Sequence, residues 1–366
     1  MTKSRSKKKQ SFLKTPVSPI ESTAAQSTDD LLRRMEHISF QGRNLAIARR
    51  IWERMITDDV LIFFGIAGAL TAGGLRLTIA QLIHSKAFDC IVSTGANLYH
   101  DLHETRGRHH YLGNPNANDA TLQAEHIDRV YDTYIDEDEF VDNDNWVAAF
   151  ASTLDPRPYT SREFLHHLGG YLWEQTGADG ILTAAYRHNM PIFCPAIADS
   201  SLGMGLSQAR HNSKHTGQID VVGDIIESAN LVNRHPKTAS IVLGGGTPKN
   251  FINQASVQAA FYSPKIEGHQ YALQIVTDVP HFGGASGSTL DEAQSWGKLS
   301  TEADQVTVHA DATLAFPLLT SALLESAEQD LKKRVAPQFS NTSKSIRMNG
   351  CRIPSDQFLA TDDRDT

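Results

Sequence analysis

Two patterns of apolar residues alternate along most of the chain and predict an α/β fold. Stretches with apolar residues at helical spacing, such as 29–39, 42–56, 78–87 and 161–176, are followed by short continuous apolar runs. An amphipathic helix has the first pattern, and a strand buried on both faces of a parallel sheet has the second. The expected strands are VLIFFG (60–65), FDCIVSTGA (88–96), MPIFCPAI (190–197), TASIVLGGG (238–246), YALQIVTD (271–278) and QVTVHAD (305–311).

This alternation predicts βαβ units in a Rossmann-like, doubly wound, mostly parallel sheet with helices on both faces. A long closing helix is expected over 312–335. Since no linker interrupts the pattern, we expect one domain over 29–340, between a flexible basic tail (1–28) and a C-terminal tail (341–366). Residues 103–160 are the least regular and are rich in His, Asn and Asp, as in an insertion over the site.

Composition narrows the class of protein only slightly. The 366 residues suffice for a well-buried core, and the net charge of −8 argues mildly against a nucleic-acid binder. No apolar run is long enough to cross a bilayer, and no secretory signal is visible. Cys90 and Cys194 lie in apolar runs far from each other and from Cys351, which predicts buried free thiols in a reducing, cytoplasmic setting.

Small and acidic residues follow every expected strand, where ligands of open α/β sheets bind. The loops are GIAGALTAGG, STGAN, ADSSLGMG, GGGTPKN, HFGGASGS and ADAT. Glycine lets a backbone approach a phosphate closely, and helix N-termini attract anions. Together the loops favour a dinucleotide, although none carries the G-x-G-x-x-G pattern. Asp199 and Asp311 either accept hydrogen bonds from ribose hydroxyls or only cap helices.

The stretch SGSTLDEAQSWGKLS (286–300) contains a lone lysine, Lys298, directly after Trp296 and a glycine. Thr289 and Glu292 have the spacing of a capping box, so a short helix is expected to begin near residue 290. Lys298 is then either an ordinary cation at a helix end or a nucleophile made reactive by desolvation against Trp296. The residues alone favour the first alternative.

Five segments nevertheless resemble the deoxyhypusine synthase family over roughly residues 38–330. In chain order they are VSTGANLYHD, IFCPAIADSSLG, IVLGGGTPKNFI, TLDEAQSWGKL and VHADATLAFPLL, of which the E-A-x-S-W-G-K run is highly specific. The resemblance implies an NAD-binding fold and a homotetramer with sites at subunit interfaces. It also implies transfer of the aminobutyl group of spermidine, through an imine on the motif lysine, to an acceptor amine.

The same resemblance implies roles for individual residues. Lys298 matches the covalent lysine, Trp296 would pack along the aliphatic polyamine, and Glu292 would hold a terminal ammonium. Contacts to NAD are implied for Gly68, Thr94, Gly95, Asp199, Gly244, Gly245, Gly246, Ser286, Ala310 and Asp311.

Several positions depart from the family pattern. Tyr99 and His100 stand in place of a glutamate pair, and Met204 and Ala285 stand in place of aspartates. Asn250, at a substrate-binding position, replaces the histidine that accepts a proton during oxidation, and an amide cannot take one at neutral pH. Groups that hold the polyamine are therefore missing, so the substrate is expected to differ from that of typical members.

His100 is our candidate for a replacement general base, because it is titratable and occupies the place of a glutamate. His103, His109 and His110 lie nearby, but their spacing is too loose for a metal site and lacks a second cluster. No metal is expected.

The sequence thus predicts an NAD-dependent transferase of alkyl groups that acts on spermidine or putrescine. A small amine acceptor, as in homospermidine synthesis, is favoured over a protein lysine. Three alternatives stay open: a true deoxyhypusine synthase, a non-catalytic relative that binds NAD or a polyamine, and a simple dehydrogenase. Neither a nucleic acid nor a membrane is expected as a partner.

Overall fold

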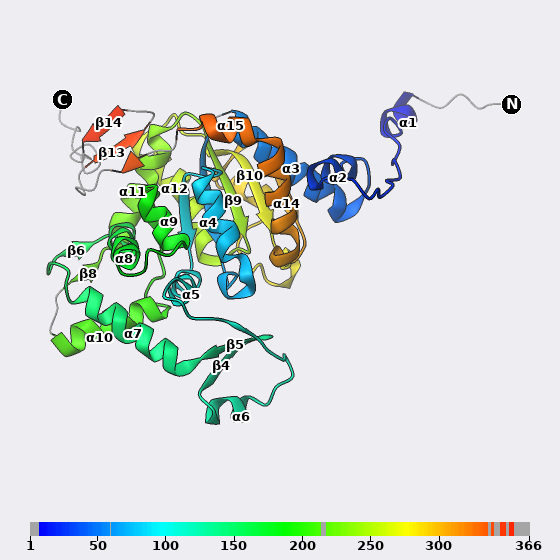
Figure 1. The fold of residues 1–366 in the computed structure, drawn as a ribbon. Helices are drawn as coiled ribbons and strands as arrows, with labels where there is room; N and C mark the ends of the chain where they lie inside the picture. The colour runs from blue at the N-terminus through cyan, green and yellow to red at the C-terminus, as the bar shows by residue number, and fades with distance from the viewer. Residues whose placement is uncertain are drawn as a thin grey trace, which may run out of the picture.

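A six-stranded sheet forms the centre of the computed structural model (Figure 1), which describes residues 7–58, 60–213 and 217–335 and the backbone of short strands beyond them. Its strands lie in the order β11-β10-β9-β1-β2-β7, and every pairing is parallel. They are β1 (Leu61–Ile66), β2 (Cys90–Ser93), β7 (Ile192–Phe193), β9 (Thr238–Leu243), β10 (His269–Ile275) and β11 (Leu299–Val308). All six predicted strands are present, and the predicted parallel α/β sheet is confirmed.

The order of the strands creates a switch point between β1 and β9. Numbered along the chain, the six strands lie across the sheet as 3-2-1-4-5-6, which is the order of dinucleotide-binding folds. The connections run one way from β1 and the other way from β9, so the loops after these two strands diverge. A crevice at the carboxyl ends is the place where such sheets bind ligands.

Helices cover both faces because the side chains of a strand alternate between them. On one face, Ile62 and Phe64 of β1 belong to the core that includes residues of α3 (Phe40–Thr57), α4 (Arg76–His84) and α14 (Ala312–Ser326). The ring of Phe64 stacks on that of Phe88 with centroids 4.5 Å apart.

On the other face, Leu61 and Phe63 pack in a separate core with residues of α11 (Val221–Arg234) and α12 (Gly246–Tyr262). Further helices are α1 (Lys7–Phe12), α2 (Thr28–Met35), α5 (Gly95–Thr105), α8 (Ser161–Thr176), α9 (Ile181–Arg187), α10 (Ser201–Ser213), α13 (Leu290–Ser295) and α15 (Glu328–Lys333). None of the helices in the described part of the chain combines the length and the apolar character needed to cross a bilayer.

The prediction of one closing helix over 312–335 is wrong. The chain forms α14 and then α15, with a break at Ala327. Ala327 at the break and Leu331 after it both pack into the large core, where they are 1% and 4% exposed. Beyond them, β12 (Gln338–Phe339), β13 (Ser345–Met348) and β14 (Cys351–Pro354) pair antiparallel. Residues 1–6 and all side chains after residue 335 lie outside the described residues, and the expected domain limits remain a prediction.

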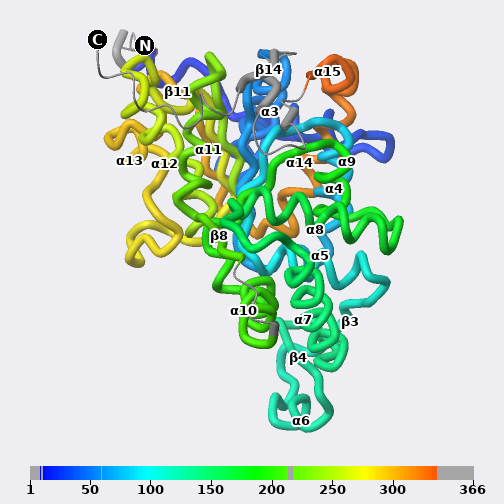
Figure 2. Tube along the Cα trace, turned by 90° about the vertical axis from the view of Figure 1, so that its left-hand side faces the viewer, coloured from blue at the N-terminus to red at the C-terminus, as the bar shows by residue number. Residues whose placement is uncertain are grey.

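Residues 111–151, here termed the projecting unit, extend away from the sheet (Figures 1 and 2). They contain β3 (Tyr111–Leu112), α6 (Asp119–Ala124), β4 (Ile127–Val130), β5 (Thr133–Asp136) and α7 (Glu137–Ala151). The three strands form an antiparallel sheet, and α7 packs against α10. The least regular part of the sequence therefore forms a folded unit.

Candidate functional site

The loops after the strands meet at the carboxyl edge of the sheet. The Thr94 hydroxyl donates a hydrogen bond of 2.9 Å to the carbonyl of Gly68, which joins the loops after β2 and β1. The Gly246 amide donates one of 3.1 Å to the carbonyl of Ser286, which joins the loops after β9 and β10. A Cβ on Gly95 would lie 2.1 Å from the hydroxyl of Ser200, so the loops after β2 and β7 also touch closely.

The residues at the switch point fit a dinucleotide. Gly68 and Gly246 have φ values of +68° and +58°, and no atom lies within 4 Å of the place where a Cβ would be. Open space over a glycine backbone and the N-terminus of α12 together suit a phosphate group. Gly244, with φ +81°, and Gly245 complete this loop, and a Cβ on Gly245 would lie 2.3 Å from the carbonyl oxygen of Ser286.

Both aspartates that follow strands are exposed at this edge. Asp311, after the half-buried Ala310, caps α14: its carboxylate accepts bonds from the amide and hydroxyl of Thr313, at 2.7 and 2.6 Å. Hydrogen bonds from Thr313 lower the pKa of Asp311. The capping role is therefore present, and a ribose contact by Asp311 or Asp199 remains a prediction.

The helix α13 begins with the predicted capping box. The Glu292 amide donates to the Thr289 hydroxyl at 3.0 Å, and the Thr289 amide donates to the Glu292 carboxylate at 2.7 Å. Leu290 packs with Leu299 in a small core against β10 and β11. Gly297, with φ +67°, ends the helix and turns the chain into β11, which places Lys298 at the foot of that strand.

Lys298 is a buried side chain and not an exposed cation at a helix end. It is 9% exposed, whereas the neighbouring Trp296 is 67% exposed. The Nζ atom lies 5.5 Å from the centre of the Trp296 ring. Its carbonyl accepts from the Ser256 hydroxyl at 3.0 Å and from the His269 amide at 3.1 Å, so the backbone is held firmly. No ion pair of Lys298 is found within the described ranges.

A cavity of about 340 Å³ lies beside α13 and is here termed the α13 cavity. Its lining includes Lys249, Gln274, Asp278, Ser286, Gly287, Thr289, Leu290, Asp291, Thr307 and His309. These residues come from α12, β10, β11, α13 and the loop before α13, and they bring several charged groups into one space.

Lys249, which the sequence analysis did not select, is the most unusual group in this cavity. It is 1% exposed, and its Nζ donates to the Gln274 side-chain oxygen at 2.9 Å and to the carbonyl of Ser288. Burial and the charge of Lys298 lower the pKa of Lys249 to about 8. One signal was available: a lysine in the first turn of a helix is unfavourable with the helix dipole.

Asn250, next to Lys249, lies under the loop that leads to α13. A Cβ on Gly287 would be 2.9 Å from the Asn250 side-chain oxygen, and Gly287 has φ +90°, so this contact requires glycine. Two further departures from the family pattern, Met204 and Ala285, face solvent: Met204 is 59% exposed and Ala285 is also exposed.

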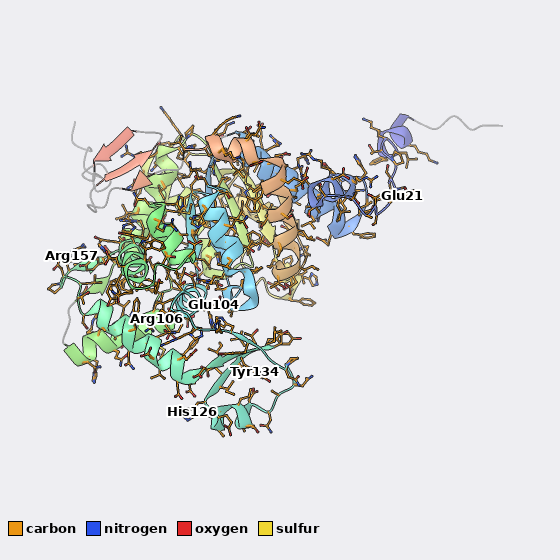
Figure 3. All side chains as sticks on the ribbon, viewed as in Figure 1. Glu21, Glu104, Arg106, His126, Tyr134 and Arg157 are labelled. Atoms are coloured by element: carbon orange, nitrogen blue, oxygen red, sulfur yellow. The ribbon has the colours of Figure 1, made fainter. Side chains whose placement is uncertain are left out.

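His100 belongs to a different cluster and does not line the α13 cavity. Its Nδ1 lies 2.8 Å from Nε2 of His110, and Nδ1 of His110 lies 2.6 Å from the carboxylate of Glu104. This histidine chain lies where α5 meets the projecting unit, and Figure 3 labels Glu104 there. Burial and the charges of His110 and His103 lower the pKa of His100 to about 4.

The cysteines and possible metal ligands complete the account of reactive groups. Cys90 and Cys194 are buried and unpaired, as predicted, while the side chain of Cys351 lies outside the described residues. Within the described ranges, no three His, Cys, Asp or Glu side chains are grouped so that they could hold a metal ion.

Comparison with known proteins identifies the family. The profile of the deoxyhypusine synthase family matches residues 30–323. The chain is 43% identical to "Probable deoxyhypusine synthase 2" of Methanosarcina mazei over 90% of this chain and 95% of that protein. It is 39% identical to "Deoxyhypusine synthase-like protein" of Coxiella burnetii, over 85% of this chain and 89% of that protein.

The fold is similar to that of a crystal structure from Entamoeba histolytica that is titled as a deoxyhypusine synthase. The TM-score is 0.57 at 18% identity, and the match covers 84% of this chain and 97% of that chain. Together with the SWGK lysine in its buried position, the matching profile and relatives lead to one conclusion: the chain belongs to the deoxyhypusine synthase family, a family of transferases.

Proposed function

We propose that this protein is an NAD-dependent aminoalkyl transferase that carries the aminobutyl group of a polyamine as an imine on Lys298. The carrying observation is the burial of Lys298 beside Trp296 with no ion pair among the described residues. A desolvated amine without a carboxylate partner is suited to act as a nucleophile toward an imine carbon.

The side chains around Lys298 suit a polyamine. The exposed face of Trp296 would pack along the methylene groups and keep water from the imine. Hydrogen bonds from Thr289 lower the pKa of Glu292, so this exposed carboxylate is charged at neutral pH and can hold an ammonium. The glycine loops at Gly68 and Gly244–Gly246 would hold NAD, and the chemistry that this group would supply there is reversible hydride transfer.

A small amine is the acceptor we favour, as in homospermidine synthesis, with spermidine or putrescine as substrates. Met204 lines a groove of about 620 Å³ near the carboxyl edge, together with Gly203 and Arg210. Among the described residues that line this groove, Arg210 carries the only charge. A groove without a carboxylate is a poor site for a long polycation, so the substrate is expected to be shorter or differently held.

The remaining parts of the proposal follow from the family. We propose a homotetramer with sites at subunit interfaces, and the 67% exposure of Trp296 leaves an aromatic face that a partner subunit would cover. Buried free thiols at Cys90 and Cys194 suit a cytoplasmic enzyme. The alternatives are a true deoxyhypusine synthase that modifies a protein lysine and a non-catalytic relative that binds NAD or a polyamine.

The test is the intact mass of the purified protein after incubation with NAD and a panel of polyamines, trapped with borohydride. An aminobutyl adduct on the wild type and none on Lys298→Ala is expected, and the donor that produces it names the substrate. A second incubation with putrescine, or with a protein lysine as acceptor, separates the two transferases. Binding of NAD without any adduct would favour the non-catalytic relative.

A further inference from the structure

We propose that Lys249 is the proton acceptor of the reaction, a role for which the sequence offered only His100. The inference rests on the proposed function. The secondary ammonium of the polyamine must lose a proton before a hydride can leave the adjacent carbon. In this step a substrate N–H bond breaks, an Nζ–H bond of Lys249 forms, and the electron pair stays on the substrate nitrogen. The oxidant of the next step is a nicotinamide dinucleotide.

The position of Lys249 suits this role. Lys249 lines the α13 cavity, and its Nζ donates hydrogen bonds to the Gln274 side chain on β10 and to the carbonyl of Ser288. These two acceptors occupy two N–H groups of the amine. The remaining tetrahedral position of a neutral amine holds the lone pair, so the lone pair has a fixed direction and is free to accept a proton.

The charges around Lys249 leave it partly neutral. Burial is the largest cause of its lowered pKa, and the positive charge of Lys298 adds to it, while Glu292 and Asp278 act in the opposite direction. Asp291 and His309 are the other titratable groups that line the cavity. With a pKa of about 8, Lys249 is poised as a general base should be, near the pH at which it works.

The alternatives to Lys249 are weaker. The side-chain amide of Asn250 has no group basic enough to accept a proton at neutral pH. His100 lies in the histidine chain outside the α13 cavity, and its low pKa makes it a poor acceptor. His309 is an exposed histidine that also lines the cavity, so the variant His309→Gln tests it as the competing base.

The experiment follows formation of reduced nicotinamide in a single turnover with saturating polyamine, from neutral to alkaline pH. The wild-type rate is expected to rise with a midpoint near 8, the value for Lys249. Lys249→Gln should lower the rate about 100-fold and abolish the rise, as expected for loss of a general base. His309→Gln should keep the midpoint, and Lys265→Gln, at an exposed lysine that does not line the cavity, is the matched control that should keep both rate and midpoint. Calorimetric binding of NAD and of polyamine should change less than about threefold in each variant.

Two further variants separate proton transfer from a structural role. Lys249→Arg can keep the hydrogen bonds but holds its proton, so it should be as slow as Lys249→Gln. The double variant Lys249→Gln/Asn250→His places a histidine next to the lost base. Its rate should be at least about tenfold above that of Lys249→Gln, and its midpoint should move toward about 6.5. If Lys249 only held the loop in place, the double variant would not show a displaced midpoint.

The results separate this inference from the proposed function. If Lys249→Gln keeps the wild-type midpoint, or if His309→Gln or His100→Gln abolishes it, Lys249 is not the proton acceptor. Failure of the wild type to form a borohydride-trapped adduct with any polyamine would instead overturn the proposed function itself.

Discussion

Two buried basic side chains, Lys249 at the α13 cavity and His100 in the histidine chain, respond to burial in the same way but with different results. Burial is the largest cause of the lowered pKa in both. The pKa of Lys249 falls from an ordinary 10.5 to about 8, and that of His100 falls from 6.5 to about 4. Lysine thereby enters the range of a working base, and histidine leaves it.

The comparison shows that the basicity of a buried group depends on its starting value as much as on its surroundings. Desolvation penalises the charged form of any base, so it lowers the pKa of lysine and histidine alike. A buried lysine can therefore reach the basicity that a proton acceptor needs, whereas a buried histidine becomes too weak a base. His100, a poor proton acceptor, instead helps to join α5 to the projecting unit through its contacts with His110 and the ring of Phe140.

The largest expected effect comes from removing the nucleophile. Lys298→Ala should lower turnover by at least about 10³-fold, because it removes the amine that is proposed to carry the aminobutyl group. Binding of NAD should be unchanged, since the glycine loops lie at the carboxyl edge. Turnover assays and equilibrium binding check this, and residual turnover within about tenfold of the wild type would contradict it.

Asp224 tests the effect of burial on an acid, because burial raises the pKa of an acid and lowers that of a base. It is 0% exposed, and burial raises its pKa to about 7. Asp224 therefore binds a proton more tightly in the folded state than in the unfolded state. Its contribution to the stability of the protein is complete below about pH 4 and is lost as the pH rises through about 7. Asp224→Asn should stabilise the protein by about 2–4 kcal/mol at pH 8 and by about 1 kcal/mol at pH 5. Thermal unfolding at both pH values checks this, and equal gains would argue against it.

Glu104 tests the histidine chain itself. Burial raises its pKa, but the hydrogen bond and charge of His110 lower it more, so the net shift is downward. The charged carboxylate therefore stabilises the fold at neutral pH, and this contribution is lost as the pH falls through the lowered pKa of Glu104. Glu104→Gln should cost about 1 kcal/mol at pH 7. Denaturant unfolding at neutral and acidic pH should show the difference only at neutral pH.

The smallest effect is expected at His100. If Lys249 accepts the proton, His100→Gln should leave turnover within about threefold and the pH midpoint unchanged, because a weakly basic, buried imidazole contributes no proton transfer. The measurement is a pH profile at saturating substrate. A loss of the alkaline rise in this variant would restore His100 as the general base.

The local features of the site were well predicted because they depend on neighbours in the sequence. The capping box of Thr289 and Glu292 and the break at Gly297 are contacts over a few residues, and the structure has both. The six strands were predicted from runs of apolar residues, which is how a strand buried on both faces must appear. The closing helix was predicted too long, since nothing in its periodicity marks Ala327 as a break.

The unusual state of Lys249 could not be predicted in this way. Its partners, Gln274 and Ser288, lie 25 and 39 residues further along the chain, and the charge that adds to its desolvation belongs to Lys298. The sequence offered only His100 as the base, and nothing in it singled out Lys249 for that role. Their surroundings, and therefore their basicity, depend on which segments cover them.

The sequence by itself determined the family, the parallel sheet with its loops of small residues, and the lysine of the SWGK run. Each can be recognised from short stretches of sequence, because it depends only on the types and the order of neighbouring residues. Only the tertiary structure decided that Lys298 is buried and not exposed, and that Lys249 shares its electrostatic surroundings while His100 lies in a separate cluster. Burial and charge change the pKa of a side chain through space. The strand order of the folded sheet therefore decides which distant residues lie close enough to change it.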